Sequence, residues 1–271
     1  DYKDFASFCV RNAFKLMPSE PKIISFYLTH LSKSCKFSTL KRRLASISVI
    51  HRLSGHYIDI KNPIITENLM GIKRIKGSYQ KAKKPILIND LKLIIDVIDK
   101  DKNEKNRFKN RALMLVGFAG GFRRSELVAI FYEDVDFVPE GVKIFVKRSK
   151  TDQSGEGMTK GIPYFSNPDY CPVISLKNWL EKSEIKSGKI FDMSDKSVAL
   201  IVKKYTAIAG LDSKKYSGHS LRSGFATSTA ELGAEERSIM AMTGHKTTQM
   251  VRRYIQEANL FKNNALNKIK L

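Results

Sequence analysis

One cluster of polar residues in this sequence follows a pair of glycines at the end of an apolar stretch. In GGFRRSEL, residues 120–127, an arginine pair is followed by Glu126, three residues after Arg123. Glycines permit close approach of the backbone, and a carboxylate at this spacing can orient a guanidinium group. Taken alone, this motif is more typical of an ordinary surface ion pair between arginine and glutamate.

A second cluster combines a histidine and an arginine. In SGHSLRSGFATS, residues 217–228, His219 and Arg222 are three residues apart and therefore share a helix face. Because the arginine repels cations, this arrangement at a helix N-terminus favours an anion over a metal ion.

The remaining clusters contain a lysine and a tyrosine. Lys150 lies in RSKTDQSGEGMT, a polar, glycine-containing stretch that predicts a hairpin loop. GHKTTQMVRRYI, residues 244–255, carries His245 and, nine residues later, Tyr254. Singly, these residues would be a solubilising lysine and a half-buried aromatic.

Together, two arginines, two histidines, a lysine and a tyrosine are what phosphoryl transfer without a metal requires. Fixed Arg and His donors can stabilise the charge on the non-bridging oxygens by about 3 to 4 kcal/mol each. A phenol can attack the phosphorus, and a lysine among cations can protonate the departing oxygen. No H-E-x-x-H, carboxylate triad, cysteine pair or P-loop accompanies these residues, so we expect neither a metal nor another cofactor.

The charge of the chain indicates a polyanionic partner. Its 48 Lys and Arg against 27 Asp and Glu give a net charge of +21, with a pI near 9.8. Nucleic acid most commonly balances such an excess, although a generically basic protein is the alternative. No segment approaches the roughly 20 apolar residues of a membrane span, and no signal peptide opens the chain. We therefore expect a cytoplasmic, nucleoid-associated protein that binds no membrane.

The 271 residues, 42% of them apolar, predict two folded domains, 1–80 and 81–271. The boundary falls in IKRIKGSYQKAKK, residues 72–84, a cationic stretch before Pro85. We expect this stretch to cross the backbone of a DNA duplex and to contact it through Lys81, Lys83 and Lys84. A solvated loop is the alternative.

The first domain is predicted to be all-helical. Its clearest helix covers residues 38–53, with Ser38 as a cap and a buried stripe formed by Leu40, Leu44, Ile47 and Ile50. Its other face could lie in a major groove, or simply be solvated, and would offer Lys41, Arg42, Ser48 and Arg52 to DNA.

The second domain predicts a mixed structure. Helices are expected over 90–100 and 106–118, the first capped by Asn89 or Asp90. Short alternating segments at 134–138, 143–147 and 160–165 predict a small antiparallel sheet, and the chain reads as helical again from about residue 172, with Trp179 in the core. The fold class is therefore mainly α with a small antiparallel β-sheet (α+β).

The polar motifs also resemble a known family. GFRRSEL at 121–127, SKT at 149–151, GHSLRSGFAT at 218–227, and GH followed by Tyr254 resemble, in this order, the motifs of the tyrosine recombinases, the phage-integrase family. The resemblance covers essentially the whole chain, because the helical N-terminal part with its basic linker is similar to the core-binding domain of that family.

The resemblance implies roles for the arginines. Arg123 and Arg222 would clamp the scissile phosphate, with Glu126 supporting Arg123. Arg124 occupies a position that many family members fill with a hydrophobic residue, which leaves its charge for the DNA backbone. Arg252, close to Tyr254 in the sequence, is expected to contact the DNA backbone or to support its helix.

The resemblance also implies which residues form the covalent bond and transfer protons. Tyr254 would attack to form a 3′-phosphotyrosyl link, and His219 would assist transfer of its proton. Lys150 would protonate the leaving 5′-oxygen, and His245 would bind a non-bridging oxygen.

A site-specific recombinase of this family would act in DNA integration, excision or dimer resolution, in a prokaryote or from a mobile element. Its partners would be double-stranded DNA with an inverted-repeat site and three further copies, in a homo-tetramer on two sites, without a small-molecule substrate. The tail, residues 257–271, would be a partly apolar helix that a neighbouring subunit or its own domain buries through Leu260, Phe261, Ala265 and Ile269. A type IB topoisomerase and a catalytically silent DNA-binding accessory protein are the alternatives.

Overall fold

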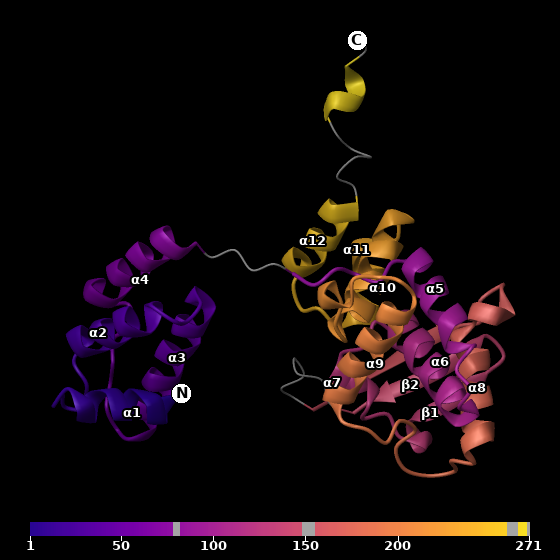
Figure 1. Ribbon diagram of the computed structural model, residues 1–271, viewed down its shortest axis with the longest axis horizontal. Coiled ribbons are helices and arrows are strands. Elements are labelled where there is room, and N and C mark those ends of the chain that lie inside the picture. Colours follow the sequence, from indigo (N-terminus) through magenta and orange to yellow (C-terminus); the bar gives the residue numbers. More distant parts are fainter. Residues whose placement is uncertain (78–81, 148–154, 259–264, 270–271) are drawn as a thin grey trace. The chain divides into compact units, whose positions relative to one another are not determined.

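The computed structural model describes residues 1–77, 82–147, 155–258 and 265–269 (Figure 1). It divides into two compact units, Asp1–Lys81 and Ala82–Leu271, each with its own buried core. Four residues singled out from the sequence lie outside the described residues: Lys81, Lys150, Leu260 and Phe261.

The first unit is built from helices around one apolar cluster. They are α1 (Tyr2–Arg11), α2 (Pro21–Ser32), α3 (Phe37–Leu53) and α4 (Pro63–Lys76) (Figure 1). Phe5 on α1, Tyr27 on α2 and Ile65 on α4 are fully buried in this cluster together with the stripe of α3.

Helix α3 differs from its prediction at both ends of the stripe. It begins at Phe37 with Lys36 as N-cap, so Ser38 does not cap it. Leu40, Leu44 and Ile47 are buried as predicted, but His51 completes the stripe and Ile50 is only half-buried. The stripe advances by four residues from Leu40 to Leu44 and by three to Ile47. A further step of four, to His51, keeps the average close to the helical period of 3.6, whereas a step of three, to Ile50, does not.

The second unit is mainly helical with a small sheet, which confirms the predicted fold class. Its helices are α5 (Ile88–Ile98), α6 (Glu104–Ala119), α7 (Arg124–Leu127), α8 (Pro172–Ser183), α9 (Asp195–Ile208), α10 (His219–Glu231), α11 (Glu236–Thr243) and α12 (Thr248–Ala258). The strands are β1 (Val135–Val138), β2 (Gly141–Val146) and β3 (Met158–Pro163), antiparallel in the order β1-β2-β3.

Helix α5 begins at Ile88 with Leu87 as N-cap, so the predicted caps were wrong. The carboxylate of Asp90 instead accepts a hydrogen bond from the hydroxyl of Tyr216 at 2.9 Å and lies 3.3 Å from Nζ of Lys84. A tertiary contact therefore takes the side chain that local spacing assigned to the helix end.

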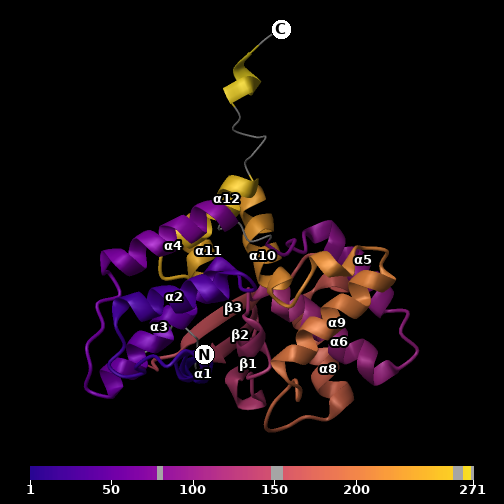
Figure 2. The same cartoon turned by 60° about the vertical axis from the view of Figure 1, so that its left-hand side comes forward.

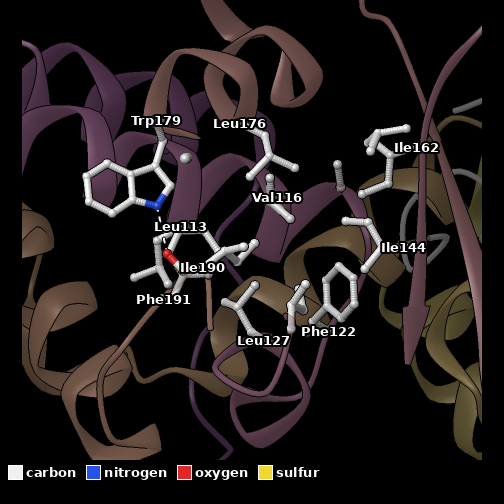
Figure 3. Packing of buried hydrophobic residues seen from close by; sticks show 14 of the residues in the cluster. Leu113, Val116, Phe122, Leu127, Ile144, Ile162, Leu176, Trp179, Ile190 and Phe191 are labelled. Atoms are coloured by element: carbon white, nitrogen blue, oxygen red, sulfur yellow. Dashed lines mark hydrogen bonds between the residues drawn. The ribbon is translucent and has the colours of Figure 1, made fainter. Parts of the chain in front are cut away.

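The main core of this unit lies between one face of the sheet and the helices α6 and α8 (Figures 2 and 3). Ile144 and Ile162 from the strands meet Val116 of α6 in this core. Trp179 is buried as predicted, and its Nε1 donates to the carbonyl of Ile190 at 2.8 Å (Figure 3). Within the described part of the chain, no helix is long and apolar enough to cross a membrane.

Candidate active site

The turn after α6 brings two backbone carbonyls to two buried cations. Gly121 adopts φ +54°, and a Cβ there would lie 3.0 Å from the ring of Phe225, so glycine suits this turn. The carbonyl of Gly120 accepts from Lys160 Nζ at 2.7 Å, and that of Gly121 accepts from Arg222 Nη1 at 2.8 Å. Carbonyls at a helix C-terminus carry partial negative charge, which favours cations there.

Arg123, directly after this turn, is oriented by Glu126. Its backbone N–H donates to Oε2 of Glu126 at 2.9 Å, and its Nη1 donates to Oε1 at 2.5 Å. Its Nη2 reaches the carbonyl of Gly244 at 3.5 Å. Burial alone would raise the pKa of Glu126, but the hydrogen bonds from Arg123 and the charges of Arg123 and Lys160 lower it. Glu126, 3% exposed, is therefore an anion that fixes the guanidinium.

Helix α10 places His219 and Arg222 on one face, beside this turn. Arg222 is 1% exposed, and burial together with the charge of Arg123 lowers its pKa to about 10, so it remains a cation at neutral pH. Its Nη2 is buried without a hydrogen-bond partner among the described residues. A buried donor without an acceptor is costly, and an oxyanion would remove that cost.

His245 and Tyr254 lie on either side of the start of α12. Gly244, at φ +62°, ends α11, and the ring centroids of His245 and Tyr254 are 6.1 Å apart. Val251 and Tyr254 pack on Ala226 of α10 and Ile239 of α11, so Tyr254 lies against helices of its own chain.

The cations of the site also act on both histidines. Burial, the largest influence, lowers the pKa of His245 to about 4 together with repulsion from four neighbouring titratable groups: Arg222, Arg123, His219 and Lys160. The pKa of His219 is lowered by burial and by the charges of Arg222, Arg123 and Arg124. Both imidazoles are therefore neutral at pH 7, in a site whose excess positive charge favours an anion.

Two residues that sequence reasoning did not select also belong to this arrangement. Lys160 on β3 is 1% exposed and donates to two backbone carbonyls. The signal for it was the alternation within the predicted strand, which places Lys160 on the same face as the buried Ile162. Thr243 donates its hydroxyl to the carbonyl of Ile239 at 2.6 Å and lies 2.8 Å from Nδ1 of His245. No pattern in the sequence indicated Thr243.

The end of the predicted linker is bound to the second unit. The backbone N–H of Lys84 donates to the carbonyl of Lys215 at 2.7 Å, and Nζ of Lys83 donates to the carbonyl of Lys214 at 2.5 Å. Ile86 packs so closely on α10 that a Cβ on Gly224 would lie 2.0 Å from the Ile86 carbonyl oxygen.

The other residues predicted to contact DNA are spread over both units. Arg124 lies 3.7 Å from Oδ2 of Asp195, and Arg252 lies 3.5 Å from Oε1 of Glu236. On α3, Arg42 pairs with Asp1, while Lys41 and Arg52 are exposed and Ser48 is half-buried. Among the described residues, no group of three or more His, Cys, Asp or Glu side chains is placed to hold a metal ion.

Known proteins are similar to this chain in sequence and in fold. The model of the phage integrase family matches residues 86–260. An integrase/recombinase XerD homologue from Selenomonas ruminantium is 42% identical over 284 residues, which cover 99% of this chain and 83% of the relative. A tyrosine recombinase from Pseudothermotoga lettingae is 26% identical over 276 residues, covering 99% and 89%.

Solved structures show the same fold at lower identity. The XerH site-specific recombinase bound to palindromic difH superposes with a TM-score of 0.62 at 17% identity, over 91% of this chain and 73% of that chain. A lambda integrase dimer bound to a core site superposes with a TM-score of 0.60 at 19% identity, over 100% of this chain and 73% of that chain. The fold is thus that of tyrosine-recombinase catalytic domains.

The chain belongs to the phage integrase family and is a tyrosine recombinase, a site-specific DNA recombinase. The resemblance noted in the sequence motifs is confirmed.

Proposed function

We propose that this recombinase cleaves DNA with Tyr254 as the nucleophile and rejoins it through a 3′-phosphotyrosyl intermediate. The observation that carries this proposal is that Arg123, Arg222, His219 and His245 form one electrostatic cluster that also contains Tyr254. The elements that bring them together are far apart in the sequence, so their convergence is a property of the fold.

Arg123 and Arg222 would bind the scissile phosphate. Glu126 holds the first guanidinium and the carbonyl of Gly121 holds the second, so both are oriented before the substrate arrives. Donors that need no reorganisation are those that stabilise a transition state most, by about 3 to 4 kcal/mol each. The Nη2 of Arg222, which has no acceptor among the described residues, could take a phosphate oxygen after a small adjustment of the site.

Cleavage exchanges one phosphate ester for another. The phenolic oxygen of Tyr254 bonds to phosphorus, the bond from phosphorus to the 5′-oxygen breaks, and Lys150 gives that oxygen a proton. His219, neutral at pH 7, accepts the proton of the phenol. Rejoining reverses these steps with a 5′-hydroxyl from the other duplex, so neither ATP nor a metal ion is consumed.

His245 would bind a non-bridging oxygen, and its hydrogen bond with Thr243 sets which ring nitrogen carries the proton. Because the hydroxyl proton of Thr243 is donated to Ile239, its oxygen is left to accept from Nδ1–H of His245. A neutral imidazole then has no proton on Nε2. A bound phosphate raises the pKa of His245, and the imidazolium can donate from Nε2 while Nδ1 stays on Thr243.

The proposed partner is a duplex with an inverted-repeat site, bound by four copies of this chain in a prokaryotic cell or from a mobile element. The XerH and lambda integrase structures contain their DNA substrates, which supports duplex DNA as the partner. In the described part of the tail, Leu266 is 67% exposed and Ile269 is 56% exposed, which supports exchange of the tail with a neighbouring subunit.

Covalent trapping tests this function and selects the target sequence in the same experiment. A library of nicked duplexes with randomised sequence is incubated with the protein in EDTA, and adducts are isolated on denaturing gels and sequenced. We expect an adduct for the wild type and none for Tyr254→Phe. Tyr132→Phe, which alters a partly exposed tyrosine of the same unit, should behave as the wild type.

An adduct that persists in Tyr254→Phe would reassign the nucleophile. If the wild type forms no adduct with any duplex, the chain would be a silent DNA-binding protein. With the trapped sequence, joining of two sites distinguishes recombination from relaxation of supercoils, which changes only the linking number.

A further inference from the structure

A lysine is buried beneath the proposed active site. Lys160 on β3 is among the largest fully buried side chains, and its Nζ lies 4.4 Å from the centroid of the Phe122 ring. Taking an ammonium group out of water costs several kcal/mol, and well-packed apolar residues often replace buried charges without loss of stability. Its presence therefore calls for a role beyond packing.

The contacts of Lys160 join two separate segments. Nζ donates to the carbonyl of Gly120 at 2.7 Å and to that of Met242 at 2.5 Å. Gly120 lies three residues before Arg123, and Met242 lies three residues before His245. Nζ also lies over the ring of Phe122, so the two carbonyls and the ring face can occupy the three donors of the ammonium form.

The other charges of the site act on Lys160. Glu126 on α7 attracts Lys160, whereas Arg123 at the start of α7 and Arg222 on α10 repel it. Burial is the largest influence and, with both arginines, lowers the pKa of Lys160 to about 7. Lys160 is thus electrostatically coupled to the side chains of the site, but its burial and its occupied donors keep it from the leaving oxygen.

We propose that Lys160 is a positioning residue for DNA cleavage: it ties the turn before Arg123 to the end of α11, so that Arg123 and His245 meet the same phosphate. This inference rests on the function proposed above. Without the tie, the two segments can separate by a fraction of an ångström, and a misplacement of about 1 Å can cost about a hundredfold in rate.

Three substitutions separate positioning from packing. Lys160→Met keeps the length and removes the charge and donors, Lys160→Gln keeps donors without charge, and Lys160→Arg keeps both. The control is Lys143→Met, which alters an exposed lysine of β2 opposite Gly161. Single-turnover cleavage of the trapped nicked duplex is measured with DNA in excess, because its amplitude counts folded molecules and its rate constant reports alignment. DNA affinity is measured in parallel.

We expect the rate constant to fall about a hundredfold in Lys160→Met, less in Lys160→Gln and least in Lys160→Arg, with DNA affinity within about threefold of the wild type. Lys143→Met should match the wild type. Two results overturn the inference: a Met variant as fast as or faster than the Arg variant, or losses confined to amplitude. If no Lys160 variant folds, the lysine is a requirement of the fold and the positioning role is rejected. Failure of the wild type itself to form an adduct would instead reject the proposed function.

Discussion

The hydroxyl of Thr243 shows how a single buried group can set the form of a catalytic histidine. Between the carbonyl of Ile239 and Nδ1 of His245, it fixes both the orientation of the ring and the nitrogen that carries the proton. A histidine is useful as a donor only if the correct nitrogen is protonated. Thr243 is itself fully buried, so it acts on DNA only through His245.

Thr243→Val should slow cleavage with little change in stability. The substitution keeps the shape of the side chain and removes its hydrogen bonds to the carbonyl of Ile239 and to Nδ1 of His245. Loss of the bond to His245, worth about 1 kcal/mol, should lower the single-turnover rate about fivefold to tenfold. The control is Thr229→Val, which removes a similar threonine-to-backbone bond on α10, to Phe225, away from the imidazole. Equal rates in both variants would show that Thr243 does not orient the histidine.

The lowered pKa of His245 predicts a loss of stability in acid. Its folded pKa, about 4, lies below its ordinary value of 6.5, so the unfolded chain binds the proton more tightly. Stability is therefore complete above about pH 6.5 and decreases as the pH falls toward 4. Because the imidazole is only half-buried, we expect a loss of roughly 1 kcal/mol between pH 7 and 5.

Urea unfolding at the two pH values measures this loss. His245→Gln, which does not titrate, should show a smaller decrease over the same interval, and His219 should account for part of what remains, since its pKa is lowered in the same direction. An identical decrease in both proteins would mean that other groups control the acid sensitivity.

At the scale of elements, the sequence predicted what depends on periodicity and missed what depends on tertiary contacts. The ends of the strands at 135–138, 141–146 and 158–163 lie within two residues of their predicted positions, because alternation is a local signal. The caps of two helices were wrong, since Lys36 and Leu87 occupy positions with no capping side chain.

The candidate active site shows the same difference between what local sequence predicts and what tertiary contacts set. The motif residues could be selected from the sequence by type and spacing, and the structure gathers five of them, with Lys150 outside the described residues. Lys160 could be placed on a strand face, but nothing local showed that this face is closed by Gly120 and Met242, which lie 40 and 82 residues away. Contacts of such separation are set by the fold, so they are visible only in three dimensions.

Helix α10 depends on a glycine for its contact with the segment at Ile86. Gly224→Ala would place a methyl group 2.0 Å from a backbone oxygen, which must move the segment or the helix. We expect a loss of about 2 to 4 kcal/mol in unfolding free energy, as for other overpacked sites. Gly71→Ala is the control: this glycine of α4 is also helical but has open space around its position, so alanine there should stabilise by about 0.5 to 1 kcal/mol. Two substitutions of equal effect would refute the close approach at Ile86.

At the scale of the whole molecule, the excess of positive charge is common to both units. Lys and Arg outnumber Asp and Glu in residues 1–81 and again in 82–271. Each unit has its own core, so neither needs the other to bury its apolar residues. If cations of both units contact the duplex, the affinity for DNA should depend steeply on salt.

The exposed cations of α3 allow this distribution of charge to be tested. If Lys41 and Arg52 each neutralise one phosphate, the double variant Lys41→Gln, Arg52→Gln should reduce the slope of log affinity against log salt by about 1.8. The loss should be similar for the trapped duplex and for unrelated DNA, because phosphate contacts carry no sequence information. Lys102→Gln, an exposed lysine between α5 and α6, should leave the slope unchanged. Fluorescence anisotropy across a series of salt concentrations measures both proteins, and an unchanged slope in the double variant would place the DNA on another face of the first unit.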